Sequence, residues 1–331
     1  MARALLALVA AATLAAPAAA QRLLLAGPPE NPLRLRAGAD GLRVEAGIDS
    51  EPGAAGRGWR LTLPRGGDVE AFVATGEGWL AAGSVPVTGG RELALWAGDA
   101  PQPGGGGSRS LPPPPGRHGA LRVNPVPLVR DGRLIALAWL EGEALDRLAV
   151  WAASWDGQRW GRPVAVAPPG RGSQLALTGA VLADGTLLLA WSAYDGEDDE
   201  VLWSRGRGER WSGSRAVAPG NHVPDVTPTV RAAGAGALLA WSRYDGNDYR
   251  LLLARFQGGG WTSPQWVAGA GTALPAWEGE SLVFRDAAHG AWVVAAVASE
   301  SRLRVVDAVA APPTPRPAAW RPRGELRLLF P

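Results

Sequence analysis

The chain has 331 residues and no cysteine, which excludes a disulfide framework, a thiolate metal site and a cysteine nucleophile. Its composition, 47% hydrophobic and 19% charged, is that of a globular chain that can bury a core. All 33 basic residues are arginine and stand against 31 acidic ones, so the net charge of +2 gives no reason to expect a nucleic-acid partner.

The first twenty residues have the layout of a secretory signal. Arg3 is followed by an apolar stretch at 4–16 and by an A-x-A cleavage site that ends at Ala20. We therefore expect residues 1–20 to be removed and residues 21–331 to be exported, to the periplasm or out of the cell, as a single domain. The apolar stretch is short for a membrane span, so no membrane-spanning segment is expected after cleavage.

Residues 101–116 (PQPGGGGSRSLPPPPG) form a low-complexity stretch. Glycine favours flexible coil and consecutive prolines favour polyproline II, so the stretch predicts a loop within the domain. Two alternatives are open. The stretch can dock a partner, or it can mark the boundary between an unrelated N-terminal domain at 21–116 and a smaller repeat domain.

Three stretches of the chain, 133–167, 186–218 and 237–268, align with one another. Each contains two tryptophans in register. The first is Trp139, Trp191 or Trp241, spaced 52 and 50 residues apart, and the second is Trp160, Trp211 or Trp261, spaced 51 and 50 apart. Self-similarity at a fixed period of this length indicates a repeat architecture.

Each repeat fits four short strands, which in the second copy are expected at 178–183, 187–192, 200–204 and 211–218. Asp-Gly turns separate strands, because Gly accepts a positive φ and Asp caps its own turn. Four strands per repeat are typical of a β-propeller blade. With 20 residues removed from 331, the length predicts an all-β propeller of about six four-stranded antiparallel blades, with five or seven as alternatives.

Degraded copies extend the repeat in both directions. We expect residues 76–79 to enter a fourth strand and 92–96 to form a second strand, while 287–298, 301–308 and 318–325 are expected as second, third and fourth strands. The two ends, 22–25 and 325–330, are both strand-like. Pairing them in one blade would close the ring and remove exposed sheet edges.

The turn before the second tryptophan carries a further pattern. Residues 204–211 (SRGRGERW) fit S-x-D-x-G-x-x-W with Gly206 in place of the Asp, and residues 154–160 (SWDGQRW) fit it one residue short. These turns resemble degenerate Asp-boxes of the sialidase-like (BNR repeat) β-propellers. The resemblance implies a structural role, between the third and fourth strands of a blade, for Ser154, Asp156, Gly157, Trp160, Ser204, Gly208, Trp211, Gly258 and Trp261.

The resemblance also implies what a sialidase-type active site needs, namely three arginines for a carboxylate, a tyrosine nucleophile with a glutamate partner, and an aspartate acid/base. Tyr194 and Tyr244 occupy equivalent positions in successive repeats, which predicts a structural role for both. Tyr249 lies off the repeat and is the candidate nucleophile. No G-x-S-x-G, H-E-x-x-H or P-loop motif is present and the three histidines are scattered, so no metal or cofactor is expected.

One face of the predicted propeller collects the loops between second and third strands and the loops between blades. Its candidate ligand-binding residues are His222, Asp225, Asp195, Asp198, Asp245 and Asp248. The D-G-x-D spacing can also hold Ca²⁺ through carboxylate and carbonyl oxygens, and the alternative is a solvated acidic hairpin. Most tryptophans are expected in the core between blades, whereas Trp266 and Trp277 break the repeat and are expected at the surface.

The sequence thus predicts an exported, monomeric β-propeller that acts as a non-catalytic ligand-binding or scaffold module, with a glycan or a protein as ligand. Two other functions stay open. One is a divergent sialidase-type glycoside hydrolase that uses Tyr249, and the other is an extracytoplasmic protein-interaction subunit.

Overall fold

The computed structural model describes residues 23–26, 33–38, 41–46, 58–61, 67–99, 108–278, 281–286, 291–299 and 302–310. Apart from one short 3₁₀ helix, η1 (Leu145–Arg147), the regular elements of this part of the chain are all β-strands. The prediction of an all-β protein is therefore confirmed. The predicted signal, residues 101–107 of the Gly/Pro-rich stretch and the C-terminal residues 311–331 lie outside the described residues.

The described strands form five sheets, whose strands pair antiparallel along the chain except at one point in the second sheet. We divide that eight-stranded sheet at this point, which gives six consecutive groups of described strands. The first three groups are β1 (Leu23–Ala26), β2 (Leu33–Gly38), β3 (Gly41–Ala46) and β4 (Gly58–Leu61); β5 (Asp68–Thr75), β6 (Gly78–Val87), β7 (Gly90–Asp99) and β8 (Ser108–Leu111); and β9 (Leu121–Arg130), β10 (Arg133–Gly142), β11 (Ala149–Ser154) and β12 (Val164–Ala167). A single parallel pairing of Arg91 with Leu121 joins the second and third groups into one sheet.

In the fourth and fifth groups the last strand is split into two short pieces. These groups are β13 (Gln174–Val181), β14 (Leu187–Tyr194), β15 (Asp199–Arg207), β16 (Arg210–Trp211) and β17 (Arg215–Ala216); and β18 (Asp225–Ala233), β19 (Gly236–Tyr244), β20 (Tyr249–Gln257), β21 (Gly260–Trp261) and β22 (Gln265–Trp266). The sixth group is β23 (Thr272–Glu278), β24 (Ser281–Asp286), β25 (Ala291–Ser299) and β26 (Arg302–Ala310).

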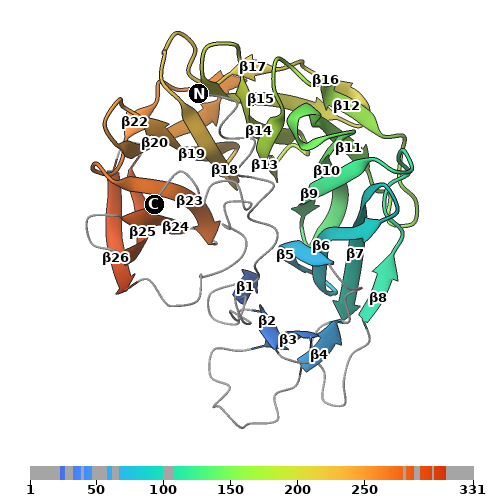
Figure 1. Cartoon of the computed structure of the whole chain (residues 1–331). Helices are drawn as coiled ribbons and strands as arrows, with labels where there is room; N and C mark the ends of the chain where they lie inside the picture. The colour runs from blue at the N-terminus through green and yellow to red at the C-terminus, as the bar shows by residue number, and fades with distance from the viewer. Residues whose placement is uncertain are drawn as a thin grey trace.

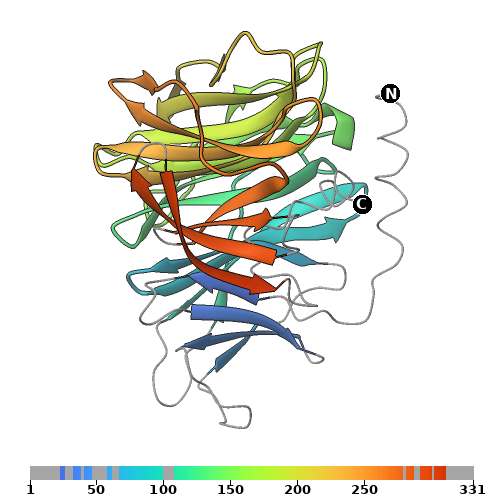
Figure 2. The same cartoon turned by 90° about the vertical axis from the view of Figure 1, so that its left-hand side faces the viewer.

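The groups follow one another around a common centre, with β5, β9, β13, β18 and β23 on the inside (Figure 1). In the side view of Figure 2, the red strands of the last group lie nearest the viewer, with the blue strands of the first group below them. This arrangement sets first strands of successive groups against one another, from β1 with β5 through to β18 with β23.

The repeated tryptophans form the core between the groups. Trp139, Trp191 and Trp241 lie at the middle of β10, β14 and β19 and are fully buried. Trp191 packs with residues of β9–β11, and Trp241 packs with residues of β14 and β15, so each tryptophan fills the space toward the preceding group. Burying aromatic side chains in this way stabilises the ring of sheets, and it confirms the predicted place of these tryptophans.

The innermost strands share an irregularity. Asn124, Ala176, Thr227 and Leu274 occupy equivalent positions in β9, β13, β18 and β23, and each has a positive φ, between 51° and 58°. A register shift accompanies each of them. Backbone groups that these bulges free are bound across the groups: Leu177 N–H donates to Asn124 Oδ1 at 3.2 Å and Leu274 N–H to Ser242 Oγ at 3.1 Å.

Several predicted strand positions were wrong. Residues 76–79 form the turn between β5 and β6 and the start of β6, a second strand, and 92–96 lie in β7, a third strand. The second strand predicted at 287–298 is a third strand, β25, and the third strand predicted at 301–308 is the fourth, β26. The reason is that Gly-containing hairpin turns are alike at every position of a blade, so turn chemistry alone does not say which two strands a turn connects.

The predicted strand at 211–218 is broken, because residues 212–214 separate β16 from β17. β1 pairs with β2, and the last group has four strands of its own. The proposed partner of the N-terminal strand, residues 325–330, and the strand expected at 318–325 lie outside the described residues.

Candidate functional site

The turns that join β14 to β15 and β19 to β20 have the same construction. Asp195 Oδ1 accepts hydrogen bonds from the backbone N–H groups of Glu197 and Asp198, at 2.8 and 3.2 Å. Asp245 Oδ1 accepts the two corresponding bonds at 3.0 and 2.9 Å. These backbone hydrogen bonds lower the pKa of both aspartates. Both carboxylates are therefore engaged in shaping their own turns.

The tyrosines before these turns support them. Tyr194 donates its hydroxyl to the carbonyl of Gly196 at 2.8 Å, and Tyr244 donates to the carbonyl of Gly246 at 3.1 Å. The structural role predicted for these two equivalent tyrosines is confirmed.

Tyr249, the candidate nucleophile, lies half-buried at the start of β20. Its ring centroid is 5.2 Å from that of Tyr244. Burial, with a smaller effect of the Asp199 carboxylate, raises the pKa of Tyr249. A raised pKa disfavours the phenolate that a nucleophile needs.

The hairpins between third and fourth strands lie at the opposite end of the strands. Asp156 Oδ1 accepts hydrogen bonds from the backbone N–H groups of Gln158 and Arg159, and Trp155 pairs with Trp160 across the turn. In the next two groups the turns contain Gly208 and Gly258, with φ of 57° and 60°. The remaining residues of the expected Asp-box set, Ser154, Gly157, Ser204, Trp211 and Trp261, lie in or beside these same three turns.

The loop at 219–225, between the fourth and fifth groups, reaches the β14–β15 turn. His222 Nδ1 lies 3.0 Å from Glu197 Oε2, and both side chains are exposed. Asn221 Nδ2 donates to Glu200 Oε1 at 2.8 Å. The structure thus brings together the interblade loop and the acidic turn of the fourth group, whereas Asp245 is bound to Arg250 within its own group, at 2.7 Å.

Asp225 was predicted to contact a ligand, but its side chain is fully buried. Arg243 Nε and Nη2 donate to its two carboxylate oxygens at 2.7 and 2.6 Å. Burial raises the pKa of Asp225, and the Arg243 guanidinium opposes that rise. The two residues are cross-strand partners at the start of β18 and the end of β19, a position that Gln174 and Ala193 occupy in the preceding group.

Two further carboxyl groups lie beside this ion pair. Glu200 is only 5% exposed, and burial raises its pKa to about 8, with the carboxylates of Asp225 and Asp198 adding to the rise. Burial also raises the pKa of Asp198, with Asp195 as the next cause. Glu200 Oε2 and both carboxylate oxygens of Asp198 are buried without a hydrogen-bond partner among the described residues. Glu200 is therefore expected to hold its proton at neutral pH.

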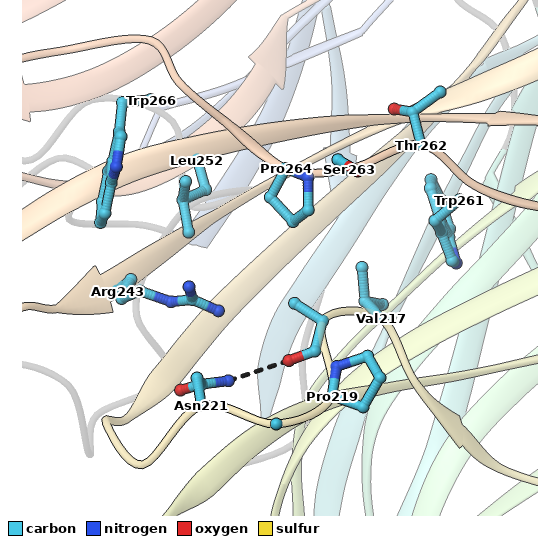
Figure 3. A pocket seen from close by; sticks show the side chains of 12 residues that line it. Val217, Pro219, Asn221, Arg243, Leu252, Trp261, Thr262, Ser263, Pro264 and Trp266 are labelled. Carbon is cyan, nitrogen blue, oxygen red and sulfur yellow. Dashed lines mark hydrogen bonds between the residues drawn. The ribbon is translucent and has the colours of Figure 1, made fainter.

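A cavity of about 490 Å³ opens next to this cluster, between the fourth and fifth groups (Figure 3). We call it the interblade groove. Its lining residues are Val217, Ala218, Pro219, Gly220, Asn221, Arg243, Leu252, Trp261, Thr262, Ser263, Pro264 and Trp266. The volume lies in the range of small-molecule sites, and the lining combines apolar surface with a few polar groups, as such sites do.

An aromatic side chain and a guanidinium stand at the same end of the groove. Figure 3 shows Trp266 and Arg243 near one another and Trp261 and Val217 at the other end. Trp266 is 48% exposed, as predicted, because it stands on β22 where the repeat has Ala216. By contrast Trp277, predicted at the surface, is half-buried and donates its indole N–H to the carbonyl of Thr229 at 3.2 Å.

Sequence reasoning missed Arg243. Its signal was a break in the repeat: A-W-S-R in the third copy against A-W-S-A in the second, together with Asp225 where the second copy has Gln174. The sequence alone does not distinguish Arg243 from the other arginines among the 33 basic residues. The strand register does, because it pairs Arg243 with a buried aspartate.

In the part of the chain that the structure describes, no three His, Asp or Glu side chains gather as metal ligands would. No helix within those same ranges is long and apolar enough to cross a membrane.

Comparison with known proteins gives a fold and no family. No family model matches the chain, and no curated protein does. Solved structures match over most of it. A puromycin-hydrolysing peptidase from Mycobacterium tuberculosis has a TM-score of 0.57 at 16% identity over 89% of this chain, and this chain spans 46% of the peptidase.

Two other similar structures match over most of their own length. The six-bladed β-propeller lectin of Aleuria aurantia, described for its fucose recognition, has a TM-score of 0.50 at 12% identity and covers 91% of this chain and 98% of the lectin. An ulvan lyase of polysaccharide lyase family PL25 has a TM-score of 0.53 at 9% identity, covering 88% and 86%. At these identities the likeness shows the fold, which is that of a β-propeller.

Proposed function

We propose that the protein is an exported, closed β-propeller of six blades that binds carbohydrate at the interblade groove without transforming it. The six antiparallel groups of strands support the blade number. The lectin and the polysaccharide lyase of similar fold are consistent with a carbohydrate ligand. From the degenerate Asp-box turns, we also propose that the protein is related to the sialidase-like β-propellers.

The observation that carries the proposal is a departure from the repeat. The fourth group has Ala193 and Ala216 at the strand positions where the fifth group has Arg243 and Trp266. A side chain that the frame needs is expected to recur between copies, as the core tryptophans Trp139, Trp191 and Trp241 do in three successive groups.

The third group holds a buried ion pair, Arg122 with Glu141, at the cross-strand position of Asp225 and Arg243, so such a pair is compatible with the frame alone. The exposed aromatic Trp266 stands where the third and fourth groups have Ala165 and Ala216, and packing does not require it. A ligand is the better explanation for Trp266.

The chemistry of these residues fits a sugar. The exposed face of Trp266 can stack on the C–H face of a pyranose ring, and aromatic side chains contribute strongly at such sites. Arg243 and Asn221 line the same end of the groove and can bind ring hydroxyls. No group with the properties of an activated nucleophile lines the groove among the described residues, and Tyr249 lies outside it.

The test is binding of immobilised and free glycans to the mature chain. We expect Trp266→Ala to weaken the best ligand about 10- to 100-fold, because stacking and burial of the ring are lost. Leu145→Ala removes a comparably exposed side chain on η1 and serves as the matched control, with affinity unchanged. Equal affinities of wild type and Trp266→Ala, or the absence of any glycan ligand, would contradict the proposal.

Export is proposed from residues 1–20, whose pattern is that of a cleaved signal. Protein recovered from the periplasm or the medium should begin at or near Gln21 when its N-terminus is sequenced. Recovery from the cytoplasm with Met1 or Ala2 retained would contradict this part of the proposal.

A further inference from the structure

We infer that the interblade groove selects uncharged sugars and rejects acidic ones such as uronates and sialic acids. This inference deepens the proposed function and rests on it. It concerns the arginine that a carbohydrate carboxylate would have to bind. Arg243 is the one charged residue among the described residues that line the groove.

The charge of Arg243 is already neutralised. Its Nε and Nη2 atoms donate to the two oxygens of Asp225 at 2.7 and 2.6 Å, a bidentate arrangement in a side chain that is only 16% exposed. Such a pair leaves the outer N–H groups free to donate to a neutral hydroxyl. The pair leaves no uncompensated positive charge. A ligand carboxylate would need such a charge to offset the free energy of its desolvation.

The surroundings of the pair add negative charge. Burial, and after it the carboxylates of Asp195, Asp225 and Glu197, raise the pKa of Asp198, so these carboxyl groups lie close to one another. Glu200 lies beside them, bound to the Asn221 that also donates to Asp225, but it holds its proton at neutral pH and adds no charge. An acidic ligand at Arg243 would join this cluster as a further like charge. Repulsion of that kind is a standard means of excluding wrong ligands.

Arg250 and His222, at the same end of the molecule, also lie beside carboxylates. Arg250, whose Cζ lies 5.9 Å from the ring centroid of Trp266, is 2.7 Å from Asp245. His222 lies 3.0 Å from Glu197. A sialidase-type carboxylate site would require three converging arginines, whereas this groove offers one, already paired. The apolar face of Trp266 and the hydroxyls of Thr262 and Ser263 suit a neutral polyol.

The test compares sugars that differ only in one carboxylate. Calorimetric titration would use D-galactose against D-galacturonate and D-glucose against D-glucuronate, with N-acetylneuraminate as a fifth probe, at pH 7 and low salt. We expect the neutral member of the better-bound pair to bind at least tenfold more tightly, and added salt to narrow the ratio. Equal or tighter binding of the acidic member would overturn the inference while leaving the proposed function standing.

A matched variant tests the cause. Asp225→Asn keeps the size and a hydrogen-bond acceptor for Arg243 but removes the negative charge, so the preference should shift toward the acidic sugar by about tenfold. Asp198→Asn, in the β14–β15 turn, tests the same charge without touching the ion pair, and Glu143→Gln is a distant control. An unchanged ratio in both cluster variants would overturn the inference. No binding of any of the five sugars would contradict the proposed function and this inference with it.

Discussion

Replacing Asp225 with alanine is expected to lower the free energy of unfolding by about 3–5 kcal/mol, the usual cost of leaving one member of a buried ion pair alone. Arg243 would lose both of its short hydrogen bonds and keep a largely buried positive charge. Urea unfolding followed by circular dichroism measures the change. The exposed pair of Arg117 and Glu143 provides the control, since Glu143→Ala should cost less than about 1 kcal/mol.

The repeat itself offers a variant that separates stability from binding. In the preceding group the same cross-strand positions hold Gln174 and Ala193, so Asp225→Gln combined with Arg243→Ala copies a pair that the fold already accepts. We expect this double variant to recover most of the stability lost by Asp225→Ala and to bind sugar at least tenfold more weakly than wild type. A double variant that binds sugar as tightly as wild type would show that Arg243 does not contribute to binding.

The second large effect concerns pH: we expect Glu200 to make the free energy of unfolding fall as the pH rises. Its pKa is about 8 in the folded chain against 4.5 in its ordinary state. Below pH 4.5 both states hold the proton, and the stability is complete. As the pH rises toward 8, the unfolded chain releases the proton and the folded chain retains it, so stability falls by up to about 1.4 kcal/mol per pH unit, and by about 3–5 kcal/mol in all.

Glu200→Gln isolates this contribution, because the glutamine carbonyl can still accept the Asn221 hydrogen bond. Unfolding free energies measured from pH 5 to pH 8 should decline more steeply in wild type than in the variant. The slopes should differ by up to about 1.4 kcal/mol per pH unit, which corresponds to one proton. Parallel curves would show that Glu200 is ionised in the folded state at neutral pH. A carboxyl group at the surface, such as that of Glu143, should leave the slope unchanged when replaced by Gln.

Much of the fold could be predicted from the sequence because large residues recur at equivalent positions of the repeat. Trp139, Trp191 and Trp241 mark the same buried point of three units, and a side chain of that size cannot shift without leaving a cavity. The copies outside these three units were placed out of phase, by two strands at 76–79 and by one strand at 287–298. There the guide was a Gly-containing turn, followed by Trp79 in the first case, and such turns are alike throughout a blade.

The site was predictable only in part. The sequence placed the loop at 219–225 beside the acidic turn of the preceding unit, and the contact of Asn221 with Glu200 agrees with that. The sequence could not show that Asp225 is buried, because an aspartate at the first position of a strand can be either exposed or buried. Pairing across two strands, which sets Arg243 on Asp225 and Trp266 at the groove, depends on register and is absent from the linear pattern.

The most direct measurement is a crystal structure of the protein grown with the sugar that binds it most tightly. Our account predicts the ring of that sugar against Trp266, with a hydroxyl within hydrogen-bond distance of Arg243 and the Asp225 ion pair intact. A sugar bound in the centre of the ring of sheets, or at the turns of Asp195 and Asp245 with the interblade groove empty, would contradict it.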